Sequence, residues 1–263
     1  MAVIYVYEEY KMTVTKKAQS GAKISWLCLT FLAFILALGV SWIIWTQLNF
    51  GYEFLYNQIA IDQHIAQYAP KNLFKTDFSL TTESERYRLF AEVVRIIHQQ
   101  GEGLASLAYL IPSQQAPKIL FTHDEVVHLQ DVSILIDKMK WVLVVALGAF
   151  IAVFIWLYKS RSAMPPFKSL LGYVFISLLL VTGIILLIGP YDVFYQLHIW
   201  AFPDDHKWFF YYEESLMSTM MKAPDLFAYI AMLLVGLGVI VFVFMMLLLK
   251  KIFMTRTLVN DSA

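Results

Sequence analysis

Four long apolar stretches dominate the pattern of hydrophobic and polar positions along this chain of 263 residues. They cover approximately residues 24–48, 141–158, 169–188 and 227–249. A helix needs about 20 mostly apolar residues to cross the hydrocarbon core of a bilayer, so each stretch predicts a transmembrane helix. The first is too long for a removable signal peptide and has no obvious small-residue cleavage site. The predicted fold class is an all-α polytopic membrane protein.

Basic side chains near the ends of these stretches predict their orientation. Lysine and arginine precede the first stretch, fill the loop between the second and third, and follow the fourth. Such residues collect on the cytoplasmic side of a membrane. We therefore predict that residues 1–23, 159–168 and 250–263 are cytoplasmic, so that both termini lie in the cytoplasm. Residues 49–140 and 189–226 are then extracytoplasmic.

The segment 49–140 is long enough to form a small domain between the first and second transmembrane helices. Its apolar positions recur at helical spacing over residues 82–99, which predicts an amphipathic helix. Thr82 and Glu85 form a candidate capping box at its start. We therefore expect a mainly helical extracytoplasmic domain.

Composition supports this interpretation and excludes some functions. The chain is 59% hydrophobic and 15% charged, against roughly 25% charged residues in soluble domains. Its net charge is zero, and no basic block of the kind that binds nucleic acid occurs. The single cysteine, Cys28, lies in an apolar stretch, so no disulfide framework and no thiolate metal site is expected.

The first candidate for chemistry is a polar cluster just before the second transmembrane stretch. Thr122 and Glu125 form a second candidate capping box and predict that a helix begins there. On that helix Asp124, His128 and Asp131 share one face. A carboxylate one turn from an imidazole fixes its tautomer and raises its basicity, as a general base requires. The alternative is a solvated helix face on which Glu125 is only a cap.

The second candidate is His198, in the aromatic segment after the third transmembrane stretch. The predicted topology places it on the same side of the membrane as His128, while His123 lies off the His128 face. Most of the surrounding rings are typical of an interfacial aromatic belt, and His198 is as readily a packing residue. Residues 204–206 are predicted to form an exposed turn.

Common hydrolytic motifs are absent from the chain. It has no zinc-protease pair of histidines flanking a glutamate, no Gly-x-Ser-x-Gly nucleophile elbow and no glycine-rich phosphate loop. Two histidines with carboxylate support remain, without a marked covalent nucleophile. This set favours acid–base catalysis of a reaction whose nucleophile belongs to the substrate.

These residues resemble the lipoprotein intramolecular transacylase (Lit) family of bacterial integral membrane proteins. The family pattern Glu-x-x-His-x-x-Asp-Val is matched by Glu125, His128, Asp131 and Val132. A second family block is matched in order, although loosely in spacing, by His198, Phe202, Trp208, Leu216, Pro224, Asp225 and Phe227. Ser133 stands where the family usually has lysine.

The resemblance implies an acyltransferase of the bacterial cytoplasmic (inner) membrane. It implies that the sn-2 acyl chain of a diacylated lipoprotein moves to the α-amine of the N-terminal cysteine, giving the lyso-form lipoprotein. His128 and His198 would be catalytic, with Asp124, Glu125 and Asp131 supporting them and Phe202 and Trp208 in the substrate pocket. Membrane lipid would be the other partner; neither a cofactor nor a metal would be required.

Two other classes remain open from the residues themselves. One is a metal-dependent membrane hydrolase that uses His128, Asp131 and His198. The other is a non-enzymatic membrane assembly or binding factor in which both histidines are structural. The position of His128 also needs an explanation, because a straight helix continuing from Trp141 would hold it about 20 Å above the interface. We therefore expect that the helix bends, lies along the surface or enters the membrane before Trp141.

Overall fold

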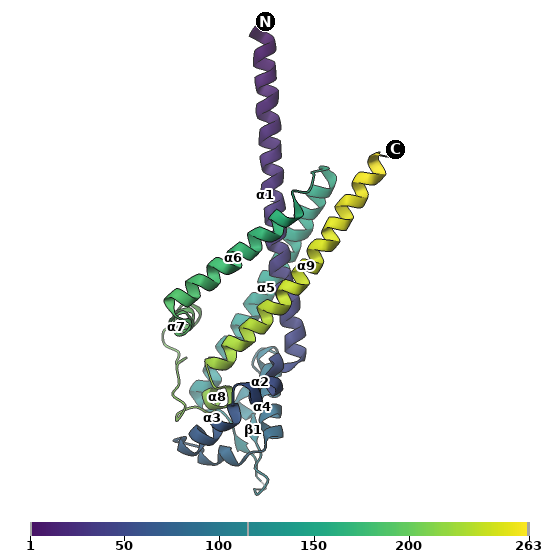
Figure 1. Cartoon of the computed structure of the whole chain (residues 1–263). Helices are drawn as coiled ribbons and strands as arrows, with labels where there is room; N and C mark the ends of the chain where they lie inside the picture. The colour runs from purple at the N-terminus through teal and green to yellow at the C-terminus, as the bar shows by residue number, and fades with distance from the viewer. Residues whose placement is uncertain (1, 115, 262–263) are drawn as a thin grey trace. The chain divides into compact units, whose positions relative to one another are not determined.

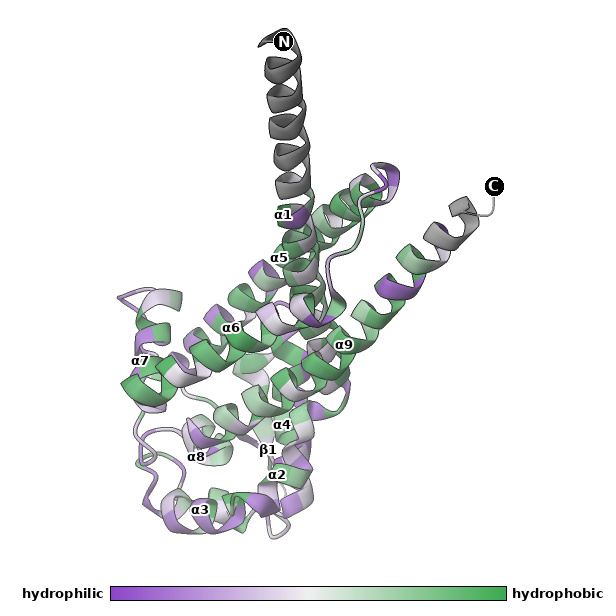
Figure 2. Ribbon diagram, turned by 45° about the horizontal axis from the view of Figure 1, so that its top comes forward, coloured by the Kyte–Doolittle hydropathy of each residue, from purple (hydrophilic) through white to green (hydrophobic). Residues whose placement is uncertain are grey.

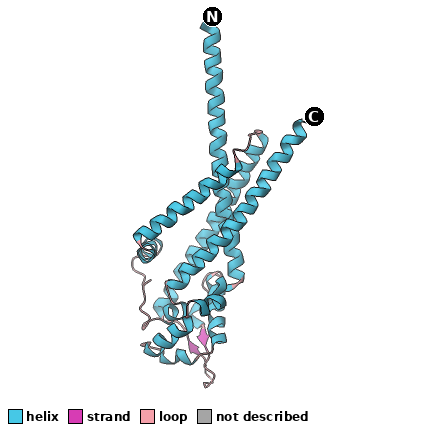
Figure 3. Cartoon of the chain, in the orientation of Figure 1, coloured by secondary structure: helices cyan, strands magenta, loops and turns pink. Residues whose placement is uncertain are grey.

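Helices make up most of the structure (Figures 1 and 3). The computed structural model describes the backbone of residues 2–114 and 116–261 and the side chains of residues 21–114 and 116–256. The long helices are α1 (Ala2–Gln47), α5 (His123–Lys159), α6 (Phe167–Ile188) and α9 (Asp225–Asp261). The shorter elements are α2 (Tyr52–Gln58), α3 (Ile61–Tyr68), α4 (Glu83–Ile97), β1 (Ala108–Tyr109), β2 (Lys118–Ile119), α7 (Pro190–Ala201) and α8 (Leu216–Met221). The outermost residues of the predicted cytoplasmic ends, 1 and 262–263, lie outside the described residues.

The chain divides into two compact units. The four-helix unit comprises residues 1–41, 143–183 and 237–263. The globular unit comprises residues 42–142 and 184–236. The predicted extracytoplasmic segments 49–140 and 189–226 both belong to the globular unit, so the second of them completes this unit rather than forming a separate loop.

The four-helix unit contains apolar stretches long enough to cross a membrane. Within the described residues, candidate spans occur at Gly21–Gln47, His123–Lys159, Phe167–Ile188 and Asp225–Arg256. The prediction of an integral membrane protein with four such helices is confirmed. Their shared core contains Trp26, Leu29, Leu157, Phe242 and Met246. By contrast α6 exposes most of its apolar side chains. Figure 2 shows this helix largely in green, the colour of hydrophobic residues.

The helix that carries His128 begins much earlier than the predicted second span. It starts at His123, as the capping box predicts, and continues without a break through residue 141, the predicted start of the apolar span, to Lys159. The predicted capping box explains this start: the Thr122 backbone N–H donates to Glu125 Oε2 at 2.6 Å, and Thr122 Oγ1 accepts from the Glu125 N–H at 3.5 Å. No glycine or proline interrupts the polar turns that follow, so they continue into the apolar stretch.

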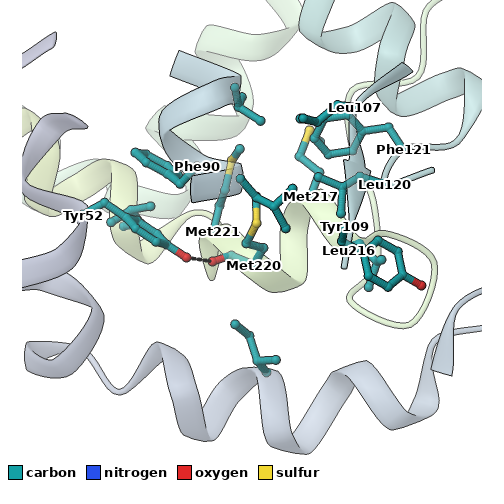
Figure 4. Packing of buried hydrophobic residues seen from close by; sticks show 14 of the residues in the cluster. Tyr52, Phe90, Leu107, Tyr109, Leu120, Phe121, Leu216, Met217, Met220 and Met221 are labelled. Atoms are coloured by element: carbon teal, nitrogen blue, oxygen red, sulfur yellow. Dashed lines mark hydrogen bonds between the residues drawn. The ribbon is translucent and has the colours of Figure 1, made fainter. Parts of the chain in front are cut away.

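The globular unit has a buried core of its own. Side chains of α2, α3 and α4 pack with the β1–β2 hairpin and with α8, and Figure 4 shows Met217, Met220 and Met221 among them. The Tyr52 hydroxyl donates to the Met220 carbonyl at 2.8 Å. Thr82 caps α4 by accepting from the Glu85 N–H, as predicted. The antiparallel hairpin is a small departure from the predicted all-α class.

Candidate active site

His128 lies on α5 inside the globular unit. Only 7% of the residue is exposed, and its Nδ1 has no hydrogen-bond partner among the described residues. Its ring packs against two phenylalanines, with centroid distances of 4.9 Å to Phe202 and 6.0 Å to Phe210. The ring therefore occupies an apolar enclosure in which water does not compete strongly for its nitrogens.

His198 lies on α7 with one ring nitrogen already engaged. Its Nδ1 is 2.8 Å from the carbonyl oxygen of Phe194, four residues earlier on the same helix. A carbonyl only accepts hydrogen bonds, so Nδ1 carries the hydrogen and, in the neutral ring, Nε2 carries a lone pair. The rings of Phe202 and Trp208 lie 5.2 and 5.1 Å from it. Phe202 and Trp208, predicted to form the substrate pocket, are thus walls around this ring.

The two histidines meet. Their ring centroids are 6.1 Å apart and their planes differ by 26°. The Phe202 ring packs against both imidazole rings and so helps to enclose the pair. Two imidazoles in this arrangement have the chemistry to take a proton from one substrate atom and to give one to another.

The environment of His198 favours the neutral ring. Burial lowers its pKa from the ordinary value, and the hydrogen bond to the Phe194 carbonyl offsets this effect only in part. The ordinary pKa of histidine is about 6.5, so a lowered value leaves His198 mostly unprotonated at pH 7. A neutral imidazole with a free lone pair at Nε2 is competent as a general base.

Asp131 has a different partner from the one expected. Its Oδ2 lies 2.7 Å from Nδ1 of His206, whereas no hydrogen bond joins Asp131 to His128. The hydrogen bond to this carboxylate raises the pKa of His206. His206 does lie in a turn, as predicted, where its N–H donates to the Pro203 carbonyl. Its ring, however, connects that turn to α5.

Glu125 is fully buried at 0% exposure and acts well beyond its own helix. Its Oε1 accepts from the Ser215 hydroxyl at 2.6 Å and from the Met217 N–H at 2.9 Å. Its Oε2 accepts from the N–H and hydroxyl of Thr122. The carboxylate therefore joins the start of α5 to the start of α8. Asp124, by contrast, is exposed and forms no hydrogen bond or ion pair with any described residue.

Three residues that contact the histidine pair or Asp131 were not predicted from the sequence. They are Phe194, Phe210 and His206. The i, i+4 spacing of Phe194 and His198 was a usable signal, because it aligns a carbonyl with a ring on one helix face. Phe210 and His206 carry no such local signal. Over the side chains that the structure describes, no group of three or more His, Cys, Asp and Glu has metal-binding geometry.

Fold and site together define a largely helical integral membrane protein in which a buried histidine, His128, packs against a half-buried one, His198. A family profile described as lipoprotein intramolecular transacylase Lit matches residues 24–224. The chain belongs to this family of membrane acyltransferases. The comparison with curated protein sequences gives no match.

Solved structures of one family member share the fold. The transacylase Lit from Bacillus cereus aligns with a TM-score of 0.60 at 13% identity, covering 90% of this chain and 98% of that chain. Structures of the same protein with one histidine replaced by arginine or by alanine give TM-scores of 0.57 and 0.55, both at 14% identity. They cover 97% and 94% of this chain, and 98% of their own.

Proposed function

We propose that this protein moves the sn-2 acyl chain of a lipoprotein's diacylglyceryl group to the α-amine of its N-terminal cysteine. The product is the lyso-form lipoprotein. Membership of the family supports the substrate class. The observation that supports the chemistry is the pairing of His128 and His198, whose ring centroids lie 6.1 Å apart inside an aromatic enclosure.

The reaction is an ester aminolysis within one substrate molecule. A C–N bond forms to the acyl carbon, the C–O bond to glycerol breaks, and one proton passes from the amine nitrogen to the glyceryl oxygen. Because both reacting groups belong to one substrate, holding them close together supplies a large part of the rate enhancement. Protein groups are needed mainly to move the proton and to stabilise the oxyanion.

The sequence favours His128 as the base because of its neighbouring carboxylates, but the hydrogen bond at His198 Nδ1 supports His198 in that role instead. Its Nε2 lone pair accepts the amine proton, and its Nδ1–H remains bound to the Phe194 carbonyl, which stabilises the imidazolium that forms. His128 is left to donate toward the oxyanion or the departing oxygen. Activity then falls as the pH is lowered through the depressed pKa of His198, because the protonated ring has no lone pair. The N-terminal amine, with a pKa of about 8, makes activity rise further toward alkaline pH.

We further propose that the histidine pair lies close to the extracytoplasmic surface of the bilayer. Helix α6 has 22 residues and is therefore about 33 Å long, close to the thickness of the hydrocarbon core. Helix α7 begins at Pro190, directly after Gly189, and carries His198. His198 is thus at most a short helix away from the end of a span. His128 contacts it, so neither ring stands far from lipid even though α5 continues unbroken.

The proposed topology has both termini in the cytoplasm and residues 49–140 and 189–226 outside. The clusters of basic residues support it. Reporter fusions after residues 163 and 260 are expected to give cytoplasmic signals, and fusions after residues 90 and 205 extracytoplasmic ones. A cytoplasmic signal after residue 205 would contradict the proposed location of the site.

The function is tested by mass spectrometry of lipoprotein N-terminal peptides from bacteria with and without this protein. We expect the amine-acylated lyso-form only when the protein is present. Purified protein with a synthetic diacylglyceryl-cysteine substrate should give the same shift of the acyl chain. A chelator should leave the rate unchanged. Loss of activity with chelator, and its return with added zinc, would instead favour the metal-dependent hydrolase.

A further inference from the structure

The globular unit contains a second polar cavity that the histidine pair does not use. It has a volume of about 350 Å³ and lies beside α3. Its polar and aromatic lining consists of Gln63, His64, Gln67, Tyr68, Tyr212 and Lys222. This volume lies at the lower end of the range found for ligand sites, which suits a short stretch of chain rather than a large cofactor.

The lining is rich in groups that hydrogen-bond to amides. Gln63 and Gln67 are exposed, stand four residues apart on one face of α3, and each offers an amide donor and an amide acceptor. Burial lowers the pKa of His64 to about 4, so this ring is neutral at pH 7. The charged lining residue is Lys222, whose Nζ donates to the Ile59 carbonyl at 2.6 Å and has further donors to offer.

The aromatic wall of the cavity is held rigidly. The Tyr212 ring packs against His64 at 4.3 Å and against Tyr68 at 4.7 Å. Its hydroxyl donates to the Ala223 carbonyl, and its own carbonyl accepts from Thr219 Oγ1. Lys222 is held at the C-cap of α8 with a φ of 43°, a conformation that costs energy for a residue other than glycine. Packing and hydrogen bonds within the globular unit therefore fix the position of the tyrosine wall.

One short segment lines both this cavity and the enclosure of the histidine pair. Phe210 packs on His128, and Tyr212, two residues later, packs on His64. Two extended residues span at most about 7 Å. A substrate group at His128 and a second group in the cavity would therefore be separated by only a few residues of an extended chain.

We propose that this cavity binds the peptide backbone that follows the acylated cysteine of the lipoprotein substrate. The proposal rests on the proposed function, because that reaction leaves a peptide chain running away from the reacting amine. The two glutamines supply paired donors and acceptors that match peptide groups, and Lys222 supplies a donor for a carbonyl. The tyrosine faces would cover the chain. Recognition through the backbone would let one enzyme accept lipoproteins of different sequence.

The test compares two synthetic substrates that differ only in the peptide. One is diacylglyceryl-cysteine amide, and the other carries four further residues of glycine and serine. We expect kcat/KM for the longer substrate to exceed that for the amide by about tenfold, as a few net hydrogen bonds allow. In the double variant Gln63→Ala/Gln67→Ala this ratio should fall to about one, mainly through KM. Gln58→Ala, an exposed glutamine on α2 outside the cavity, should keep the wild-type ratio.

Other outcomes separate this inference from the proposed function. Equal kcat/KM for both substrates in the wild-type protein, or an unchanged ratio in the double variant, would overturn it. If neither substrate reacts, the transacylase proposal fails. Binding of the unlipidated, fluorescently labelled pentapeptide then tests whether the cavity binds a peptide chain. Binding that is lost in the double variant supports it. Absence of peptide binding contradicts the proposed peptide site. Displacement of the peptide by phosphatidylglycerol vesicles alone also contradicts it and would identify a lipid headgroup site instead.

Discussion

The two units of this protein are specified by different physical means. In the four-helix unit the core is apolar, and the buried Thr30 hydroxyl donates to the Trp26 carbonyl within its own helix. In the globular unit, buried polar side chains connect distant segments, as Glu125 joins α5 to α8. Apolar stretches therefore identify the first unit from the sequence, whereas the second depends on particular long-range pairings.

The difference follows from what surrounds each unit. Lipid tails are as apolar as leucine, so burial from water does not drive membrane helices together, and close packing has to do so. The four-helix unit shows this at Gly39, which faces Leu143, and at Gly238, which faces Leu38. A domain outside the bilayer folds against water and tolerates buried polar groups only when they are hydrogen-bonded. The candidate catalytic residues His128 and His198 belong to the globular unit, which we propose lies outside the hydrocarbon core.

The largest effect should come from the histidine pair. We expect His128→Ala and His198→Ala each to lower the rate of lyso-form production by at least about 100-fold, which is typical for loss of a general acid or base. The double variant should cost little more than either single variant, because groups that act as a unit are non-additive. Rates and thermal unfolding of the purified proteins measure this. Full activity of His198→Ala would refute the paired mechanism.

The next effect should be on stability, at Glu125. Glu125→Ala leaves the Thr122 N–H, the Ser215 hydroxyl and the Met217 N–H without their acceptor in a buried site. We expect a loss of about 3 kcal/mol or more, since each buried unpaired group costs about 1–3 kcal/mol. Glu125→Gln should cost less, because it keeps an acceptor oxygen. In contrast Thr30→Val in the four-helix unit should change stability by under about 1 kcal/mol. If thermal unfolding showed equal losses of stability for Glu125→Ala and Thr30→Val, buried polar contacts would matter equally in both units, which contradicts the comparison of the two units.

An intermediate effect is expected where Asp131 holds the 203–206 turn to α5. Asp131 raises the pKa of His206, so the charged pair is fully present below pH about 6.5 and is lost as the pH rises through the raised value. Asp131→Asn should return the His206 titration, followed by NMR, toward its ordinary midpoint. It should also lower activity several-fold, because the same segment carries Trp208 and Phe210 to the histidines. Asp205 raises this pKa by its charge alone and less than Asp131 does, so the matched control Asp205→Asn should lower the midpoint by a smaller amount. A His206 midpoint unaffected by Asp131→Asn would contradict the pairing.

The smallest effect tests packing in the four-helix unit. A Cβ added at Gly238 would lie 2.6 Å from the Leu38 Cδ2, the end of a flexible side chain. Gly238→Ala should therefore cost about 1 kcal/mol, as Leu38 changes rotamer. Gly183→Ala, with nothing within 4 Å, should be neutral or slightly stabilising because alanine favours helices. Thermal unfolding in detergent compares them, and equal values would show that close approach at Gly238 does not matter.

Much of the architecture was predictable because its signals are local. The apolar stretches give four candidate spans. The capping boxes at Thr82 and Thr122 start α4 and α5 where expected, since a cap depends on residues three apart. The polar helix predicted from Thr122 and the apolar stretch predicted from residue 141 form one continuous helix, α5, because charged residues in a helix do not end it.

What the sequence by itself determined is the membrane class, the helix starts and the residue types available for acid–base chemistry. Tertiary structure alone decided which of these residues meet. In the folded chain Asp131 forms a hydrogen bond with His206, 75 residues away, and Glu125 forms one with Ser215, 90 residues away. It also enclosed the histidine pair with Phe202 and Phe210. Helix caps and spans depend on neighbours within a few residues, whereas these contacts depend on how distant segments pack, which no local pattern encodes.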